Sequence, residues 1–276
     1  FTPPLGVEIQ TWLWDFGDGN TSTDQNPTHL YSNAGVYNAV LIVTDTNGCQ
    51  GYDTNVVIVD TLPIANFSFT DTICLGDTTF FSDLSVNTSG NINNWQWNFG
   101  DGNTSTDINP YHIYSNPGTY TVTLTVTDDN LCTHTDTQTV IIRPNPIASF
   151  TATTVCVGDT TELISTSISD SIYANIAGTI NSWQWNFGDG NGYGDDLDII
   201  QHAYTSDGPY LVTLIVTDQY GCDTEVSDSV YVTPGPIANF TSDTVCEGDS
   251  TTFTDLSQFT PPLGVEIQTW LWDFGD

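Results

Sequence analysis

Six cysteines recur at two regular positions along this chain of 276 residues. They form two classes, which are Cys74, Cys156 and Cys246 in the first and Cys49, Cys132 and Cys222 in the second. An even, regular set of cysteines is typical of disulfide-bonded extracellular proteins. Zinc binding is not indicated, because the sequence has neither a C-x-x-C spacing nor a cysteine–histidine cluster.

Side chains with oxygen atoms form a second set that could do chemistry, since calcium needs several oxygen ligands close together. The densest group is Asp189, Asn191, Asp195, Asp196 and Asp198. Its spacing does not match a full calcium loop, so ordinary turn chemistry is the alternative. Calcium is therefore a candidate cofactor, and the sequence indicates no other.

Aromatic residues alternate in W-x-W-x-F segments, including those that begin at Trp12, Trp95 and Trp183. Such a ladder on one face of a strand could stack sugar rings. The alternative is that the second tryptophan and the phenylalanine fill a core. We therefore expect these second tryptophans, together with one from a truncated fourth copy, to be core residues: Trp14, Trp97, Trp185 and Trp272.

Catalysis is not indicated, and we expect no enzyme. The four histidines, His29, His112, His134 and His202, lack a repeated nucleophile or a paired carboxylate at fixed spacing. We expect His29, His112 and His202, which precede a tyrosine at equivalent positions, to be structural residues at strand edges.

The cysteines, acidic residues and aromatic residues described above lie in repeated sequence units. Residues 1–18 are identical to residues 259–276, which gives a period of 258 residues. A shorter repeat is marked by W-D/N-F-G-D at Trp14, Trp97, Trp185 and Trp272, at spacings of 83, 88 and 87 residues. Three units therefore make one period. We expect a window on a longer tandem array in one continuous chain.

Each unit reads as a series of short strands. In 118–128 (GTYTVTLTVTD) apolar side chains alternate with threonines, the period-two pattern of a half-buried antiparallel strand. Clusters of Gly, Asn, Asp and Pro separate the strands. About seven strands in about 85 residues predict an all-β, immunoglobulin-like sandwich.

The motif W-D/N-F-G-D-G, followed by G-x-Y-x-V-x-L-x-V-T-D, resembles the PKD (polycystic kidney disease) domain over essentially the whole chain. The variant with cysteines resembles tandem arrays in giant surface proteins and adhesins of gliding bacteria. The resemblance implies a linear array of sandwiches. We expect parts of domains at 1–62 and 236–276, and whole domains at 63–145 and 146–235.

Sandwich topology limits the possible disulfides. The first turn lies at the end where the chain leaves the domain, whereas the sixth turn lies at the opposite end, roughly 33 Å away along a strand of ten residues. Disulfide Cα atoms must lie within about 7 Å. We therefore predict an interdomain Cys74–Cys222 bond, with Cys49, Cys132, Cys156 and Cys246 bonded to copies outside this window. An intradomain Cys74–Cys132 bond, made possible by an irregular first strand, is the alternative.

The charge is strongly one-sided, with 34 acidic residues, one basic residue (Arg143) and a net charge of −33. Nucleic acids and anionic membranes are poor partners for such a surface, and no segment indicates membrane insertion. The predicted function is a structural repeat region of a long extracellular filament, stalk or adhesin on a bacterial cell surface, stiffened by proline joints and interdomain disulfides. Its expected partners are further copies of the repeat, and polysaccharide or another surface.

Two alternatives to a structural role remain open. One is an array of modules in which every unit binds carbohydrate or a surface, and the other is an accessory region of a secreted hydrolase. Several D-S/T-x triplets also resemble a bacterial O-glycosylation sequon, which predicts a glycoprotein. The acceptors expected near domain joints are Thr61, Thr72 and Thr244.

Overall fold

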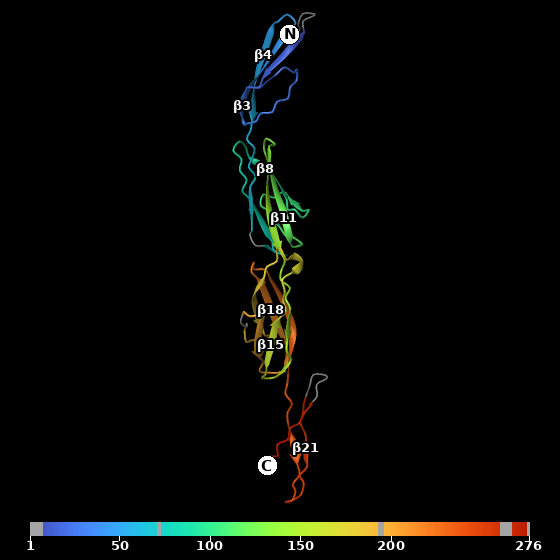
Figure 1. Cartoon of the computed structure of the whole chain (residues 1–276). Helices are drawn as coiled ribbons and strands as arrows, with labels where there is room; N and C mark the ends of the chain where they lie inside the picture. The colour runs from blue at the N-terminus through green and yellow to red at the C-terminus, as the bar shows by residue number, and fades with distance from the viewer. Residues whose placement is uncertain (1–7, 71–72, 193–195, 260–266, 275–276) are drawn as a thin grey trace. The chain divides into compact units, whose positions relative to one another are not determined.

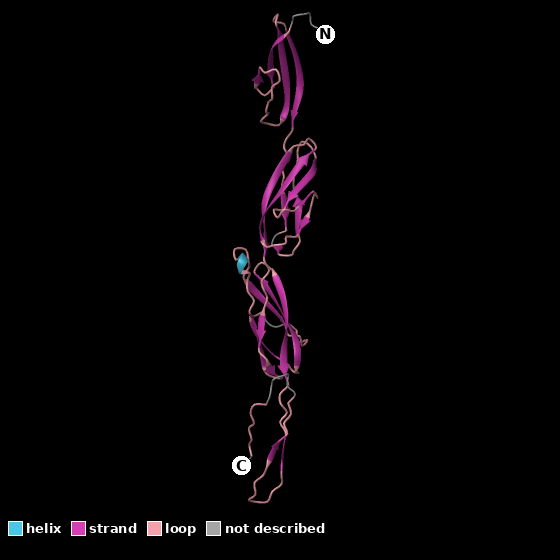
Figure 2. Cartoon of the chain, turned by 90° about the vertical axis from the view of Figure 1, so that its right-hand side faces the viewer, coloured by secondary structure: helices cyan, strands magenta, loops and turns pink. Residues whose placement is uncertain are grey.

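The computed structural model describes residues 8–70, 73–192, 196–259 and 267–274. Strands dominate, and the described residues contain one short 3₁₀ helix and no α-helix, as Figure 2 shows. No helix in this part of the chain is long and apolar enough to cross a membrane. The all-β prediction is confirmed. The chain divides into two compact units, which are Phe1–Thr70 with Thr78–His112 and Tyr120–Val140, and Asp71–Asp77 with Ile113–Thr119 and Ile141–Asp276.

The N-terminal segment forms one four-stranded sheet in the order β2-β1-β3-β4. Its strands are β1 (Ile9–Asp15), β2 (Thr21–Ser22), β3 (Gly35–Asp45) and β4 (Gln50–Val59), and β3 and β4 are labelled in Figure 1. Trp14 lies opposite Leu41, whereas Leu13 lies opposite Ile42. Because neighbours along a strand point to opposite faces, these two pairs lie on opposite faces of the sheet.

The next domain has the two sheets of a sandwich, in the orders β10-β7-β5 and β6-β12-β11-β8-β9. The first sheet contains β5 (Phe67–Phe69), β7 (Thr79–Asp83) and β10 (Tyr111–His112). The second contains β6 (Ile73–Cys74), β8 (Ile92–Asn98), β9 (Thr104–Ser105), β11 (Gly118–Asp128) and β12 (Thr133–Arg143). The rings of Phe67 and Phe81 reach across to Trp97, with centroids 5.2 and 5.6 Å away.

The third domain repeats this architecture in the orders β13-β15-β17 and β14-β19-β18-β16. Its strands are β13 (Phe150–Ala152), β14 (Val155–Cys156), β15 (Thr160–Ser165), β16 (Ile180–Asn186), β17 (Ile199–Ala203), β18 (Gly208–Asp218) and β19 (Asp223–Thr233). An insertion before β16 carries the 3₁₀ helix η1 (Ser171–Tyr173), whose N-terminus is capped by the Asp170 side chain. In the last segment, the strands among the described residues are the hairpin of β20 (Phe240–Ser242) and β21 (Phe253–Asp255).

The period-two pattern predicted the core. In β11, Val122, Leu124 and Val126 are fully buried, and the alternate threonines face outward. Trp97 and Trp185 are also fully buried, and their indole N–H groups donate to the carbonyls of Asp107 and Leu197. Trp14 is only partly buried, and Trp272 is exposed, so the prediction that Trp272 is a core residue is wrong for this chain. Each of them lies in a part of the chain that has one of the two expected halves of a sandwich.

The glycine of the F-G-D motif has a steric role. Gly100 has a φ of +84°, and a Cβ atom there would lie 2.5 Å from the carbonyl oxygen of Thr121. Any other residue would be strained in this conformation and would also collide with the neighbouring strand. The glycine thus lets β8 turn sharply beside β11.

Candidate functional site

The turn that carries the second class of cysteines is built the same way in all three domains. The aspartate that ends the long strand accepts backbone N–H bonds from the residues two and four positions later, the second of which is the cysteine. These aspartates are Asp45, Asp128 and Asp218. The side-chain cap fixes the position of each cysteine at the end of the domain.

The first class of cysteines lies beside the end of the last strand. β6 pairs in parallel with β12, and Cys74 lies opposite Arg143. In the third domain β14 pairs in the same way with β19, and Cys156 lies opposite Thr233. These parallel pairs place the first-turn cysteine where the chain leaves its domain, as sandwich topology predicts.

Cys74 and Cys222 form a disulfide, with Cα atoms 5.5 Å apart and a separation of 148 positions in sequence. The predicted pairing is confirmed. Both residues belong to the same compact unit, because the segment that contains Cys74 groups with the domain of Cys222. The bond therefore joins the exit of one domain to the sixth turn of the next.

Arg143 adds a second contact that the sequence analysis did not predict. Its guanidinium carbon lies 3.4 Å from the centre of the Tyr220 ring, and its Nη1 donates to the Ile176 carbonyl at 2.7 Å. The Asn145 side chain also donates to the Leu75 carbonyl at 3.3 Å. The available signal was that the only basic residue of the chain precedes a predicted joint, and that a tyrosine lies two residues before Cys222. We call Cys74, Arg143, Ile176, Tyr220 and Cys222 the joint cluster.

The arginine–tyrosine pair is specific to one joint of the period. At the positions equivalent to Arg143 the chain has Asp60 and Thr233. At those equivalent to Tyr220 it has Asn47 and Asn130. The three joints of a period thus differ in chemistry.

The other four cysteines are free in this structure; Cys49, Cys156 and Cys246 are exposed, and Cys132 is partly exposed. Burial raises the pKa of the Cys132 thiol, and the carboxylates of Asp128 and Asp60 raise it further. The bonding of these four residues to copies outside the window stays a prediction.

A histidine–carboxylate pair recurs in the first three domains, with Nε2 of the histidine 2.7 Å from the aspartate. The expectation that these histidines have no paired carboxylate at a regular spacing is therefore wrong, since the paired residues are 11, 11 and 13 positions apart. The pairs are Asp18–His29, Asp101–His112 and Asp189–His202. Each histidine ring also stacks on the phenylalanine of the F-G-D motif, with centroids 3.9 to 4.4 Å apart. The His29 bond lowers the pKa of Asp18 to about 2. We find no nucleophile in these contacts, and the pairs hold a turn against a strand.

In the second and third domains the aromatic ladders do not form an open platform. Trp97 and Trp185 are in the core, and Trp95 and Trp183 are partly buried. The indole N–H of Trp95 donates to Asp83 at 2.7 Å, and that of Trp183 donates to Ser165 at 3.2 Å. In the second and third domains, the first tryptophan of the ladder thus covers the core edge and is bonded to the other sheet.

The predicted calcium ligands have separate roles where the structure describes them. Asp189 bonds to His202 and Asn191, and Asp196 accepts the backbone N–H of Trp183. Asp195 lies outside the described residues. Within the described ranges, no group of three or more acidic, histidine or cysteine side chains is arranged to hold a metal ion. Calcium binding stays a prediction.

The three predicted acceptor threonines differ in their surroundings. Thr61 is exposed, but its hydroxyl lies 3.0 Å from that of Thr88 and 2.7 Å from that of Ser89. Thr244 is exposed, and Thr72 lies outside the described residues. Modification of these residues stays a prediction.

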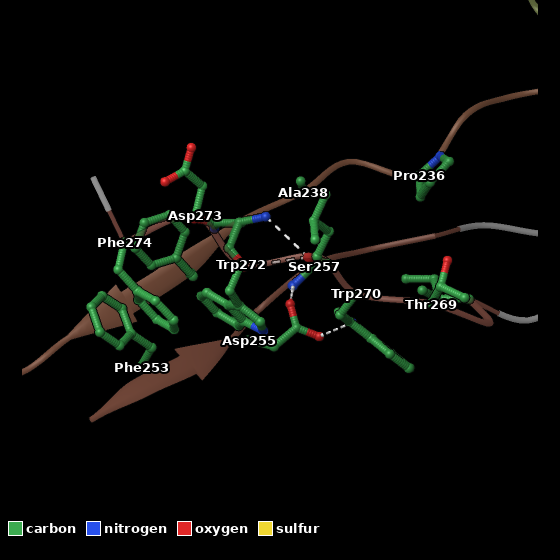
Figure 3. Close-up of a pocket in the computed structure, with 14 residues that line it drawn as sticks. Pro236, Ala238, Phe253, Asp255, Ser257, Thr269, Trp270, Trp272, Asp273 and Phe274 are labelled. Atoms are coloured by element: carbon green, nitrogen blue, oxygen red, sulfur yellow. Dashed lines mark hydrogen bonds between the residues drawn. The ribbon is translucent and has the colours of Figure 1, made fainter. Parts of the chain in front are cut away.

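An aromatic cavity of about 330 Å³ lies in the last segment, between residues 236 and 274. Figure 3 shows Phe253, Trp272 and Phe274 around it, with Asp255 bonded to Trp270 and Ser257. Phe240 and Trp272 meet edge to face at 5.4 Å, as Phe150 and Trp185 do at 5.4 Å in the third domain. The cavity therefore corresponds to the uncovered face of a half-built core, and we do not assign it a ligand.

Three consecutive segments of the chain match a known domain family. Residues 3–59, 60–142 and 143–234 each match the PKD domain family. The chain is 47% identical over 68 residues to a microbial collagenase of Vibrio alginolyticus, covering 22% of this chain and 8% of that protein. It is 34% identical over 124 residues to the pre-pro-metalloprotease PrtV of Vibrio cholerae, covering 44% of this chain and 13% of that protein.

A solved structure, the PKD1 domain of Vibrio cholerae PrtV, is 36% identical, with a TM-score of 0.28 over 30% of this chain and 98% of that one. The chain spans about a tenth of the length of the curated relatives it matches. Because the family matches cover most of the sequence, the chain belongs to the PKD domain family.

Proposed function

We propose that this chain is a load-bearing repeat region of a long extracellular filament, stalk or adhesin on a bacterial cell surface. The observation that carries the proposal is the Cys74–Cys222 disulfide, which joins two successive domains. When the chain is pulled from its ends, the covalent path passes from residue 74 directly to residue 222. The strands between these residues then lie outside the path of tension.

The same arrangement is proposed for the remaining cysteines. Cys156 lies beside the exit of its domain as Cys74 does, and Cys49 and Cys132 occupy the same capped turn as Cys222. In a continuing array, Cys156 and Cys246 would each pair with the sixth-turn cysteine of the following domain. Every domain interior would then be shielded from tension, and the joints would be stiffened by the prolines and the disulfides.

This role fits a non-catalytic module better than a binding or enzymatic one. In the second and third domains the tryptophans of the ladders are packed or bonded, which argues against repeated sugar-stacking platforms. The related proteases and collagenases share only a small part of their length with this chain. An extracellular location agrees with the disulfide.

Single-molecule stretching tests the proposal. With handles on both termini, the fully stretched reduced chain should be longer than the oxidised chain by about 500 Å, because 148 residues are released at about 3.3 to 3.6 Å each. The Cys74→Ser, Cys222→Ser double variant should match the reduced chain under oxidising conditions. Equal lengths of the oxidised and reduced natural chains would contradict shielding by the bond.

A further inference from the structure

The outward face of the N-terminal sheet carries a group of apolar side chains, with polar residues such as Asn38 and Thr54 between them. Leu13, Ile42 and Tyr52 form one row across β1, β3 and β4, because Leu13 pairs with Ile42 and Ile42 pairs with Tyr52. Leu13 is 43% exposed and Tyr52 is 83% exposed. With Val36, Val40 and Val56, these side chains form what we call the outer apolar face. Trp14 and Leu41 point to the opposite side of the sheet. A second sheet that packed on Trp14 and Leu41 would therefore leave the outer apolar face exposed.

The repeat itself shows that the fold does not require this face. At the six equivalent positions the next domain has only glutamine and threonine: Gln96, Thr119, Thr123, Thr125, Thr135 and Thr139. Two of them, Thr125 and Thr135, hydrogen-bond across the strands at 2.8 Å. Since the polar version folds as a complete sandwich, the apolar version indicates an interaction surface.

Charge distribution favours a second copy of the chain as the occupant. With a net charge of −33, two copies repel each other over most of their surfaces. On the described outward rows of β1, β3 and β4, Asp15 is the only charged side chain. Copies can therefore approach closely through this face, and two flat sheets pack at about 10 Å.

We propose that the outer apolar face is a lateral self-association surface, through which two copies pack sheet against sheet. An identical face on both copies satisfies the symmetry of a two-fold contact. The face recurs once in each 258-residue period, so a long array presents it repeatedly, and individually weak contacts add up. This inference goes beyond the load-bearing role and does not depend on tension.

Sedimentation equilibrium of the 276-residue chain tests the proposal. The variant Ile42→Thr, Tyr52→Thr, Val56→Thr carries the threonines that the next domain has at the equivalent positions, where they are compatible with folding. This variant should weaken self-association at least about tenfold. The control is Leu211→Thr with Tyr231→Thr, which removes two side chains, 62% and 57% exposed, from the equivalent face of the third domain. The control should associate like the natural chain, and added salt should strengthen both.

A rearranged chain excludes association through the uncovered inner faces of the two partial domains, because it joins these two parts into one domain. It begins at residue 63, runs to residue 276 and continues with residues 19–62, and the identity of 1–18 with 259–276 makes the junction seamless. In this rearranged chain too, the threonine variant should self-associate more weakly than the natural residues, and the control should associate as the natural residues do. Asp273→Asn, at the position of Asp15, should strengthen association by removing the one charge, and both intact domains have asparagine at this position.

Three results would overturn the proposal. They are a monomeric natural chain at all concentrations, equal association constants for the natural chain and the threonine variant, and an equal loss in the control. Binding of a different macromolecule by the natural chain, without self-association, would assign the face to that partner instead.

Discussion

The guanidinium carbon of Arg143 lies 3.4 Å from the centre of the Tyr220 ring, so the only basic side chain of the chain lies on the turn that leads to Cys222. A covalent bond and a cation–π contact therefore meet at one joint. The disulfide limits how far the two domains can separate, and the planar arginine side chain adds an orientation that the bond alone does not impose.

Removing the arginine should loosen this joint. Arg143→Ala should destabilise the third domain by about 1 to 2 kcal/mol, because both the ring contact and the bond to the Ile176 carbonyl are lost. A double-mutant cycle with Tyr220→Ala, followed by urea unfolding, should give a coupling energy of about 1 kcal/mol. Arg143→Lys keeps the charge and should recover only part of the loss. A coupling energy of zero would show that the stacking is unimportant.

In the rearranged chain described above, we expect a second interdomain disulfide. Residues 19–62 would complete the domain that follows Cys156, so Cys49 would occupy the position that Cys222 occupies in the first joint. Peptide mapping without reduction should recover a Cys156–Cys49 pair beside Cys74–Cys222. The 276-residue chain serves as the control, because there Cys49 and Cys156 should stay free. Free thiols in both chains would refute the repeated pairing.

Leu131 has a φ of 65°, where the equivalent turns have Gly48 and Gly221. A left-handed conformation costs a residue with a Cβ atom about 1 to 2 kcal/mol, and Leu131 is 81% exposed, so its side chain gains little from packing. Leu131→Gly should therefore stabilise the second domain by about 1 kcal/mol, measured by thermal unfolding. Leu131→Ala keeps the unfavourable conformation and should leave stability nearly unchanged. A loss of stability in the glycine variant would show that the leucine side chain contributes packing.

Acid should destabilise every domain through the histidine–aspartate pairs. The pKa of Asp18 is lowered to about 2, chiefly by the bond to His29. For Asp101 and Asp189, burial raises the pKa, but hydrogen bonds from His112, His202 and nearby asparagines outweigh it and lower the pKa. A carboxylate with a lowered folded-state pKa stabilises the fold above its unfolded pKa, and this stabilisation is lost as the pH falls through the folded value.

Thermal stability should therefore decline as the pH falls from about 4 to about 2. The double variant Asp101→Asn, Asp189→Asn should show a shallower decline than the natural chain. Asp207→Asn, at an exposed carboxylate, is the control with one charge removed. Parallel curves for the double variant and the natural chain would exclude these pairs as the source of acid sensitivity.

Local patterns predicted much of the fold. Alternating residues such as Val122 and Thr123 indicated strands with one buried face, because the side chains of a strand point alternately to its two faces. The cysteine pairing also followed, since the two turns lie at opposite ends of a sandwich. Local patterns did not predict the 3₁₀ helix η1, the partial burial of Trp14 or the exposure of Trp272. The burial of those tryptophans depends on a second sheet that local patterns do not provide.

The sequence by itself determined the repeat, the strand pattern and the positions of the cysteines, because each depends on residues that are neighbours along the chain or on exact recurrence. Only the tertiary structure decided that Arg143 stacks on Tyr220, that Trp95 bonds to Asp83, and that Leu13, Ile42 and Tyr52 form one outward row. These contacts join residues that are not neighbours along the chain. They exist because strand register and domain ends bring such residues together, which no local pattern specifies.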